Sequence, residues 1–122
     1  MQLEARIVRL QLAETFVIAR DATDETDVVL VALSHKGTTG YGEAAPVERY
    51  GESAESAAQF VESHGELVGD DPFALEEIGA RFAAVRGEEA AKAAIDAALH
   101  DLQGKLLGIP AHRLLGLPRS LP

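Results

Sequence analysis

The chain has 122 residues, a formal net charge of −9 and no cysteine. This length fits one domain with a buried core, and the apolar fraction of 47% is ordinary for a globular protein. The acidic balance argues against nucleic acid or an anionic membrane as a partner, because phosphate binding needs clustered lysine and arginine. The lack of cysteine excludes disulfides and thiol chemistry. No apolar run is long enough for a signal peptide or a membrane span, which predicts a cytoplasmic protein.

Three strands are predicted in the first third of the chain. Leu3 to Leu12 alternates apolar and polar residues, with a change of phase near Ile7 that indicates a bulge or a change of buried face. Residues 13–27 are expected to form a long connection, apolar at first and then acidic. Val28 to Leu33 is a continuous apolar run, typical of a strand covered on both faces. Residues 41–45 return after a KGTTG turn, which completes an antiparallel meander.

Three helices are predicted after the strands. Ser53 is a suitable N-cap for a helix that runs to about Ser63. Asp71-Pro72 is typical of a second helix start, and that helix is expected to continue to Gly87. The third helix, residues 88–107, has the clearest pattern in the sequence. Its apolar stripe recurs at three- and four-residue steps: Ala91, Ala94, Ile95, Ala98, Leu99, Leu102 and Leu106.

Strands followed by helices predict an α+β fold, with a three-stranded antiparallel sheet followed by a three-helix layer. The core is expected to be aliphatic, because aromatic residues make up 5% of the chain. Its expected large members are Phe16, Phe60, Phe73 and Phe82. The many alanines of the third helix predict that another backbone packs closely against it.

Motifs for catalysis and metal binding are not found in this sequence. The acidic segment 21–27 lacks the central glycine and the oxygen spacing of an EF-hand loop, and the four histidines are scattered. Gly40-Tyr41-Gly42 opens a strand and not a helix, so it does not fit a dinucleotide fingerprint. The pairs Asp96–His100 and Asp101–Lys105 are interpreted as ordinary helix-surface pairs. We therefore assign no catalytic residue and no metal ligand to this chain.

Two segments remain as candidate binding loops. Phe16, Ile18 and Arg20 combine an apolar flap with a cation, which suits a site that excludes water and holds a carboxylate. The alternative is a loop packed on its own sheet, with Arg20 paired to a neighbouring acid. The second candidate is Arg49-Tyr50-Gly51, whose alternative interpretation is a turn that leads into a helix.

Three stretches resemble the N-terminal capping domain of the enolase superfamily, in its muconate-lactonizing and dipeptide-epimerase branch. AAIDAALHDLQGKLLGIPAHRLLG, residues 93–116, is similar to the last helix of that domain, where AxxDxALxDLxGKxLGxPxxxLLG leads into a (β/α) barrel. FVIARDATDETDVVLVAL and GYGEAAPVERYGES resemble the segments that hold the so-called twenties and fifties loops. In such proteins the two loops close over the barrel mouth and set substrate choice.

The resemblance implies roles for four residues. Phe16 and Arg20 belong to the first loop, Arg49 and Tyr50 to the second, and all four are expected to bind substrate. An arginine at the position of Arg20 can face the distal carboxylate of an acidic dipeptide. The resemblance further implies Mg²⁺ for the full-length enzyme, held by barrel carboxylates, with barrel lysines that move the proton alpha to a carboxylate. This chain contains none of those barrel residues, so alone it is expected to be inactive and to bind no cofactor.

The same resemblance predicts the domain organisation. Residues 1–122 form one capping domain, with a meander over 1–45, helices over 53–107 and a linker over 108–122 toward a barrel that this chain lacks. The implied partners are the barrel of the same protein and a small carboxylate substrate such as a dipeptide, and a homo-oligomer stays open.

The favoured function is L-Ala-D/L-Glu-type dipeptide epimerisation. The alternatives are the capping domain of a muconate cycloisomerase or an N-acylamino-acid racemase, and a stand-alone interaction domain that reuses the fold. An apolar, exposed outer face on the third helix would indicate a missing partner surface.

Overall fold

One antiparallel sheet of three strands organises the N-terminal part of the chain. The computed structural model describes residues 1–18 and 21–120, with side chains described for these residues except 12–18, 21–24 and 49. The strands lie in the order β1-β2-β3. Their bounds are β1 (Gln2–Ile18), β2 (Asp21–His35) and β3 (Thr38–Ala44).

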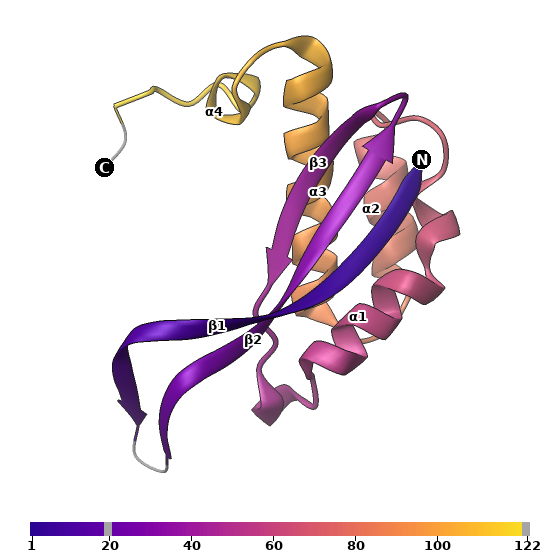
Figure 1. Cartoon of the computed structure of the whole chain (residues 1–122). Helices are drawn as coiled ribbons and strands as arrows, with labels where there is room; N and C mark the ends of the chain where they lie inside the picture. Colours follow the sequence, from indigo (N-terminus) through magenta and orange to yellow (C-terminus); the bar gives the residue numbers. More distant parts are fainter. Residues whose placement is uncertain (19–20, 121–122) are drawn as a thin grey trace.

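Helices follow the strands and cover one face of the sheet (Figure 1). In chain order the elements are η1 (Glu48–Tyr50), α1 (Ala54–Ser63), η2 (Gly65–Val68), α2 (Leu75–Ala83), α3 (Glu89–Leu107) and α4 (Ala111–Leu114), where η marks a 3-10 helix. The predicted α+β fold, a three-stranded antiparallel sheet followed by a helical layer, is confirmed. The described residues form no barrel.

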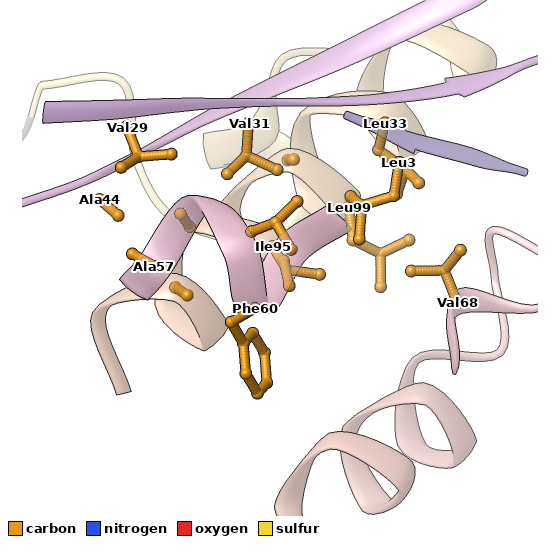
Figure 2. Packing of buried hydrophobic residues seen from close by; sticks show 14 of the residues in the cluster. Leu3, Val29, Val31, Leu33, Ala44, Ala57, Phe60, Val68, Ile95 and Leu99 are labelled. Atoms are coloured by element: carbon orange, nitrogen blue, oxygen red, sulfur yellow. The ribbon is translucent and has the colours of Figure 1, made fainter. Parts of the chain in front are cut away.

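The hydrophobic core lies between the sheet and the helices. Figure 2 shows Val29, Val31 and Leu33 pointing from β2 toward Ile95 and Leu99 of α3, and all five side chains are buried. The predicted apolar stripe of α3 is buried from its first member through Leu102, while its last member is partly buried against the core.

The opposite face of the sheet mixes polar and apolar side chains. Glu4, Arg6 and Glu43 are exposed there. β2 was expected to be covered on both faces, and on this face Val28 is buried whereas Leu30 and Ala32 are only half-buried. That expectation holds only in part because a run of apolar residues does not reveal which side of a strand a helix covers.

β1 and β2 continue past the helices as a projecting two-stranded hairpin (Figure 1). A long connection was expected over residues 13–27, yet Gln11 pairs with Glu25 and, after a register shift, Phe16 pairs with Thr23. That prediction was wrong because a ladder needs only backbone hydrogen bonds, and charged side chains suit a ribbon with solvent on its faces. An irregularity was expected near Ile7, but the register shift lies further along β1.

Gly40 and Gly42 of β3 allow α3 to approach the sheet very closely. A Cβ atom built at Gly40 would lie 2.2 Å from the carbonyl oxygen of Ala98, and one at Gly42 would lie 1.9 Å from that of Ala94. The two facing alanines of α3 are themselves almost completely buried. The close backbone packing predicted from the alanines of α3 is confirmed, and the G-x-G pattern has a packing role.

The predicted start of α1 is confirmed and that of α2 is not. Ser53 caps α1, because its hydroxyl accepts from the Ser56 N–H at 3.0 Å and the Ser56 hydroxyl accepts from the Ser53 N–H. Asp71 instead caps a local turn, accepting from the Phe73 N–H at 2.9 Å, and α2 begins later, at Leu75. The predicted end at Gly87 was also late, since α2 ends at Ala83.

Phe73 was expected in the core but is exposed. It lies in the turn before α2, and the neighbouring Pro72 is buried in its place. The Pro72 carbonyl accepts a hydrogen bond at 2.8 Å from the buried side chain of Gln103 on α3. The turn is therefore attached to α3 through its backbone and not through the aromatic ring.

Asp101 and Lys105 of α3 bind the free edge of β3. The Tyr41 N–H donates to Asp101 at 2.8 Å, and the Lys105 ammonium donates to the Thr39 carbonyl at 2.9 Å. The two side chains also pair with each other at 3.0 Å. Interpreting them as an ordinary helix-surface pair was therefore incomplete, because they satisfy backbone groups at the edge of the sheet.

This arrangement predicts a pH-dependent contribution from Asp101. Burial favours the neutral carboxyl, but the hydrogen bonds from Tyr41 and Lys105 and the charge of Lys105 outweigh it, so the pKa of Asp101 is lowered. A lowered pKa stabilises the fold above the unfolded value of about 3.9, and this stabilisation is lost as pH falls through the folded value. We expect Asp101→Asn to be less stable than wild type at neutral pH, with the difference shrinking as the pH falls below the unfolded value. Urea unfolding of both proteins at neutral pH and through the acidic range measures this, and a difference that does not change with pH would contradict it.

Candidate functional site

The projecting hairpin and η1 leave the sheet at the same end. Ala44, the last residue of β3, lies opposite Val29 of β2. From Val28 back toward the hairpin tip, the described residues of β2 pair with β1 and not with β3. The chain leaves β3 there and enters η1 through Pro46 and Val47. Both candidate binding segments therefore begin at one end of the sheet.

An ion pair joins the two strands at the base of the hairpin. Arg9 of β1 lies opposite Asp27 of β2, and its Nε donates to the carboxylate at 2.9 Å. A second carboxylate, that of Glu25, lies 3.7 Å from the same guanidinium. The hydrogen bond from Arg9 lowers the pKa of Asp27. These exposed contacts hold the strands in register where the hairpin leaves the helices.

The structure places three of the four predicted substrate-binding residues, at least by their backbone, on these two segments. The backbone of Phe16 lies in β1 opposite Thr23, while Arg20 lies outside the described residues. Arg49 and Tyr50 lie in η1; the Arg49 side chain is outside the described part, and the Tyr50 side chain is exposed. Substrate binding by these residues stays a prediction.

The turn that carries Arg49 and Tyr50 has a defined backbone. The Tyr50 N–H donates to the Val47 carbonyl at 3.0 Å, and the Gly51 N–H donates to the Glu48 carbonyl at 2.8 Å. Gly51 ends the turn with a φ of +76°, a left-handed conformation that glycine adopts without strain. This geometry agrees with the alternative interpretation of the segment as a turn before a helix.

Glu52 is a residue of this region that the sequence analysis missed. Its carboxylate accepts a hydrogen bond at 2.7 Å from the Glu89 N–H, at the start of α3. The side chain is buried, with 8% of the residue exposed. A glutamate in a polar turn is usually solvated, so composition gives no signal for such a contact. The fold brings the first turn of α3 to this end because Gly42, late in β3, lies against Ala94, early in α3.

Four large apolar side chains are exposed at the other end of α3 and in the segment that follows it: Leu107, Ile109, Leu115 and Leu117. The chain folds back here, with the Ile109 N–H donating to the Gly104 carbonyl at 2.9 Å. The outer face of α3 itself exposes Ala93, Ala97 and Asp96, which make a poorer apolar surface. The exposed large apolar residues thus lie at the end of α3 and after it, and they do not form an apolar face along the helix.

Among the residues that the structure describes, no group of three or more histidine, aspartate or glutamate side chains is placed to hold a metal ion. The described helices also include none with the length and apolar character needed to cross a membrane.

Residues 2–116 match the family described as mandelate racemase / muconate lactonizing enzyme, N-terminal domain. The chain belongs to this family, within the enolase superfamily. The resemblance stated from the helix motif and the two loop segments is confirmed.

The relatives of this chain include dipeptide epimerases. It is 40% identical over 112 residues to an L-Ala-D/L-Glu epimerase of Bacteroides thetaiotaomicron, an alignment that covers 91% of this chain and 29% of that protein. A dipeptide epimerase from Enterococcus faecalis, solved with Mg and L-Leu-L-Tyr, is similar with a TM-score of 0.86 and 33% identity, covering 93% of this chain and 33% of that one.

Muconate lactonizing enzymes share the same fold. The Pseudomonas fluorescens enzyme, solved with muconolactone, gives a TM-score of 0.85 and 29% identity, covering 97% of this chain and 34% of that one. The chain therefore spans about a third of the length of the relatives it matches. It is similar to the N-terminal domain of enzymes with two different reactions.

Proposed function

We propose that this chain is the substrate-capping and specificity domain of a Mg²⁺-dependent dipeptide epimerase. The observation that carries the proposal is the 40% identity to an L-Ala-D/L-Glu epimerase along nearly the whole chain. The projecting hairpin and η1 support it, because they leave the sheet at one end and so are able to act on the same ligand. Rigid sheets that present variable loops are a common basis for substrate recognition.

The two segments make different contacts with the substrate. Phe16 acts from the hairpin, and the guanidinium of Arg20 binds the distal carboxylate of an acidic dipeptide. Arg49 and Tyr50 act from η1, where the ring of Tyr50 is exposed and covers the substrate. Closure of such loops excludes water and fixes the orientation of the substrate, and it does not itself transfer a proton.

The chemistry belongs to a barrel that follows the linker, residues 108–122. Mg²⁺ and its carboxylate ligands would lie there, and when bound the metal would stabilise the enolate formed by proton abstraction alpha to a carboxylate. The residues described here offer no such ligand group, so no step is assigned to them. The exposed apolar side chains Leu107, Ile109, Leu115 and Leu117 lie at the end of α3 and in the linker, where they contact the barrel.

The role of Arg20 is tested by substrate preference in the full-length protein that carries this domain. We expect Arg20→Ala to lower kcat/KM for L-Ala-L-Glu by about 10- to 100-fold, the loss of a charge-assisted hydrogen bond of about 1.5–3 kcal/mol. The value for L-Ala-L-Leu, which lacks the distal carboxylate, should change by less than about threefold. Steady-state epimerisation of both dipeptides measures this, and equal losses would show that Arg20 does not read the side-chain carboxylate.

A muconate cycloisomerase is the second candidate function. The similarity to the P. fluorescens enzyme over 97% of this chain favours it. Its substrate also carries carboxylates, so the same cationic loop would serve. Turnover of cis,cis-muconate by the full-length protein, without exchange of any dipeptide α-proton, would select this alternative.

A further inference from the structure

Glu52 and Gln103 are the two buried polar side chains in the part of the chain that the structure describes side chain by side chain, with 8% and 6% exposed. Burial of a carboxylate is costly unless strong hydrogen bonds compensate. Gln103 joins α3 to the turn before α2. Glu52 lies at the opposite end of α3, next to η1, so its contact bears directly on the candidate binding turn.

Glu52 caps α3 from another segment of the chain. The N-cap residue of α3, Glu88, has a left-handed φ of +56° and forms no capping hydrogen bond through its side chain. The first N–H of the helix, that of Glu89, donates instead to Glu52 at 2.7 Å. A short hydrogen bond from a backbone N–H to a carboxylate, at the positive end of a 19-residue helix, is among the stronger helix-capping hydrogen bonds.

Glu52 directly follows η1 in the chain, so its contact with the Glu89 N–H links η1 to α3. Gly51 ends η1 on one side, and Ser53 caps α1 on the other. Two backbone hydrogen bonds of η1 run within the turn, from the Tyr50 N–H to the Val47 carbonyl and from the Gly51 N–H to the Glu48 carbonyl. The Glu52 carboxylate therefore attaches the end of the turn to α3, which packs along β3.

We infer that Glu52 is a positioning residue for substrate binding, which holds the Arg49-Tyr50 turn in its binding orientation by attaching it to the first turn of α3. The inference rests on the proposed function, in which η1 contacts the substrate. Loss of the attachment leaves the turn folded locally but free to sample other orientations. The substrate must then select the productive orientation, which raises KM while the proton-transfer groups of the barrel are untouched.

The experiment compares Glu52→Ala, Glu52→Asp and Glu52→Gln with Gln103→Ala in the full-length protein. Alanine and the shorter aspartate both break the 2.7 Å contact, whereas glutamine keeps an oxygen acceptor at the same reach. Gln103→Ala is the matched control, because it removes the other buried side chain-to-backbone hydrogen bond at the far end of α3. If the alanine variant does not fold, the aspartate variant carries the test.

The rate of trypsin cleavage after Arg49 in the absence of substrate reports how readily the Arg49-Tyr50 turn leaves its folded position. We expect the Glu52→Ala and Glu52→Asp variants to be cleaved there at least about tenfold faster than wild type, with cleavage after Arg81 in α2 unchanged. The Glu52→Gln and Gln103→Ala variants should stay within about twofold of wild type at Arg49. Equal acceleration at both arginines would mean global destabilisation and would overturn the inference.

Kinetics with L-Ala-L-Glu give the second readout. We expect Glu52→Ala and Glu52→Asp to raise KM about five- to tenfold with kcat within about twofold, and glutamine to restore the wild-type KM. An unchanged KM in the alanine and aspartate variants would overturn the positioning role. A wild-type protein that epimerises no dipeptide would instead reject the proposed function, and the cleavage pattern would still decide whether Glu52 holds the turn.

Discussion

Replacing Gly42 with alanine is expected to force α3 away from the sheet and to cost at least about 3 kcal/mol of unfolding free energy, the upper end of the range for overpacked cores. The added Cβ would lie 1.9 Å from the carbonyl oxygen of Ala94 and 2.9 Å from its carbonyl carbon. Both are backbone atoms of a buried helix, so no side-chain rotation relieves the clash. The helix must shift as a unit, which also disturbs the contact of Gly40 with Ala98.

Gly79→Ala is the matched control for Gly42→Ala. Gly79 lies inside α2, and a Cβ there would meet no atom within 4 Å beyond its chain neighbours and the backbone of its own helix. Alanine is favoured over glycine in a helix interior by roughly 0.5–1 kcal/mol, so this variant should be stabilised. Urea unfolding followed by circular dichroism measures both changes. A Gly42→Ala protein within about 1 kcal/mol of wild type would contradict the close packing of α3 on β3.

Leu102→Ala is expected to lower the unfolding free energy by about 2–5 kcal/mol. Leu102 is 0% exposed and is one of the largest fully buried side chains in the described part, together with Leu33 and Leu99. Its removal leaves a cavity between α3 and β3. The surroundings are held by the close contact at Gly40, so they collapse poorly around that cavity.

Leu107→Ala distinguishes a side chain that is buried within this domain from one that is buried only against a partner, by its effect on the unfolding free energy. Leu107 lies five residues further along the same helix and is 52% exposed, so the substitution should cost less than about 1 kcal/mol in the 122-residue chain. In the full-length protein the cost should rise if the barrel covers this residue. Parallel urea unfolding of the two variants measures the difference, and equal costs for Leu102→Ala and Leu107→Ala in the short chain would contradict the described core.

The features that the sequence predicted well are those set by local pattern. The apolar stripe of α3 repeats with helical spacing, and its members from Ala91 to Leu102 are buried. The Ser53 cap lies one residue before α1, as its side chain requires. Such signals are carried by residues close together in the chain, so a single sequence reveals them.

The features that the sequence did not predict depend on partners far apart in the chain. The Glu52–Glu89 contact joins residues 37 positions apart, and the Tyr41–Asp101 contact joins residues 60 positions apart. The hairpin was interpreted as a loop because its acidic composition resembles one, whereas its pairing is a backbone property. Phe73 was placed in the core by residue type alone, although the turn at Asp71 leaves it exposed.

Both candidate segments stand out by residue type, but residue types alone left a packed loop and a turn before a helix as the alternatives. The binding role of the Arg20 and Arg49-Tyr50 segments is implied by the resemblance and stays a prediction. The structure adds that both segments begin at one end of the sheet and that Glu52 ties the second to α3.

The most direct test of the proposed function is exchange of the glutamate α-proton of L-Ala-L-Glu in D₂O. The full-length protein is incubated with Mg²⁺ and the dipeptide, and the loss of the α-proton signal is followed by NMR. If this domain caps a dipeptide epimerase, deuterium should enter the dipeptide at that α carbon and L-Ala-D-Glu should form. The 122-residue chain alone should catalyse neither change. Absence of exchange with the full-length protein would contradict the assignment of this domain to an epimerase of acidic dipeptides.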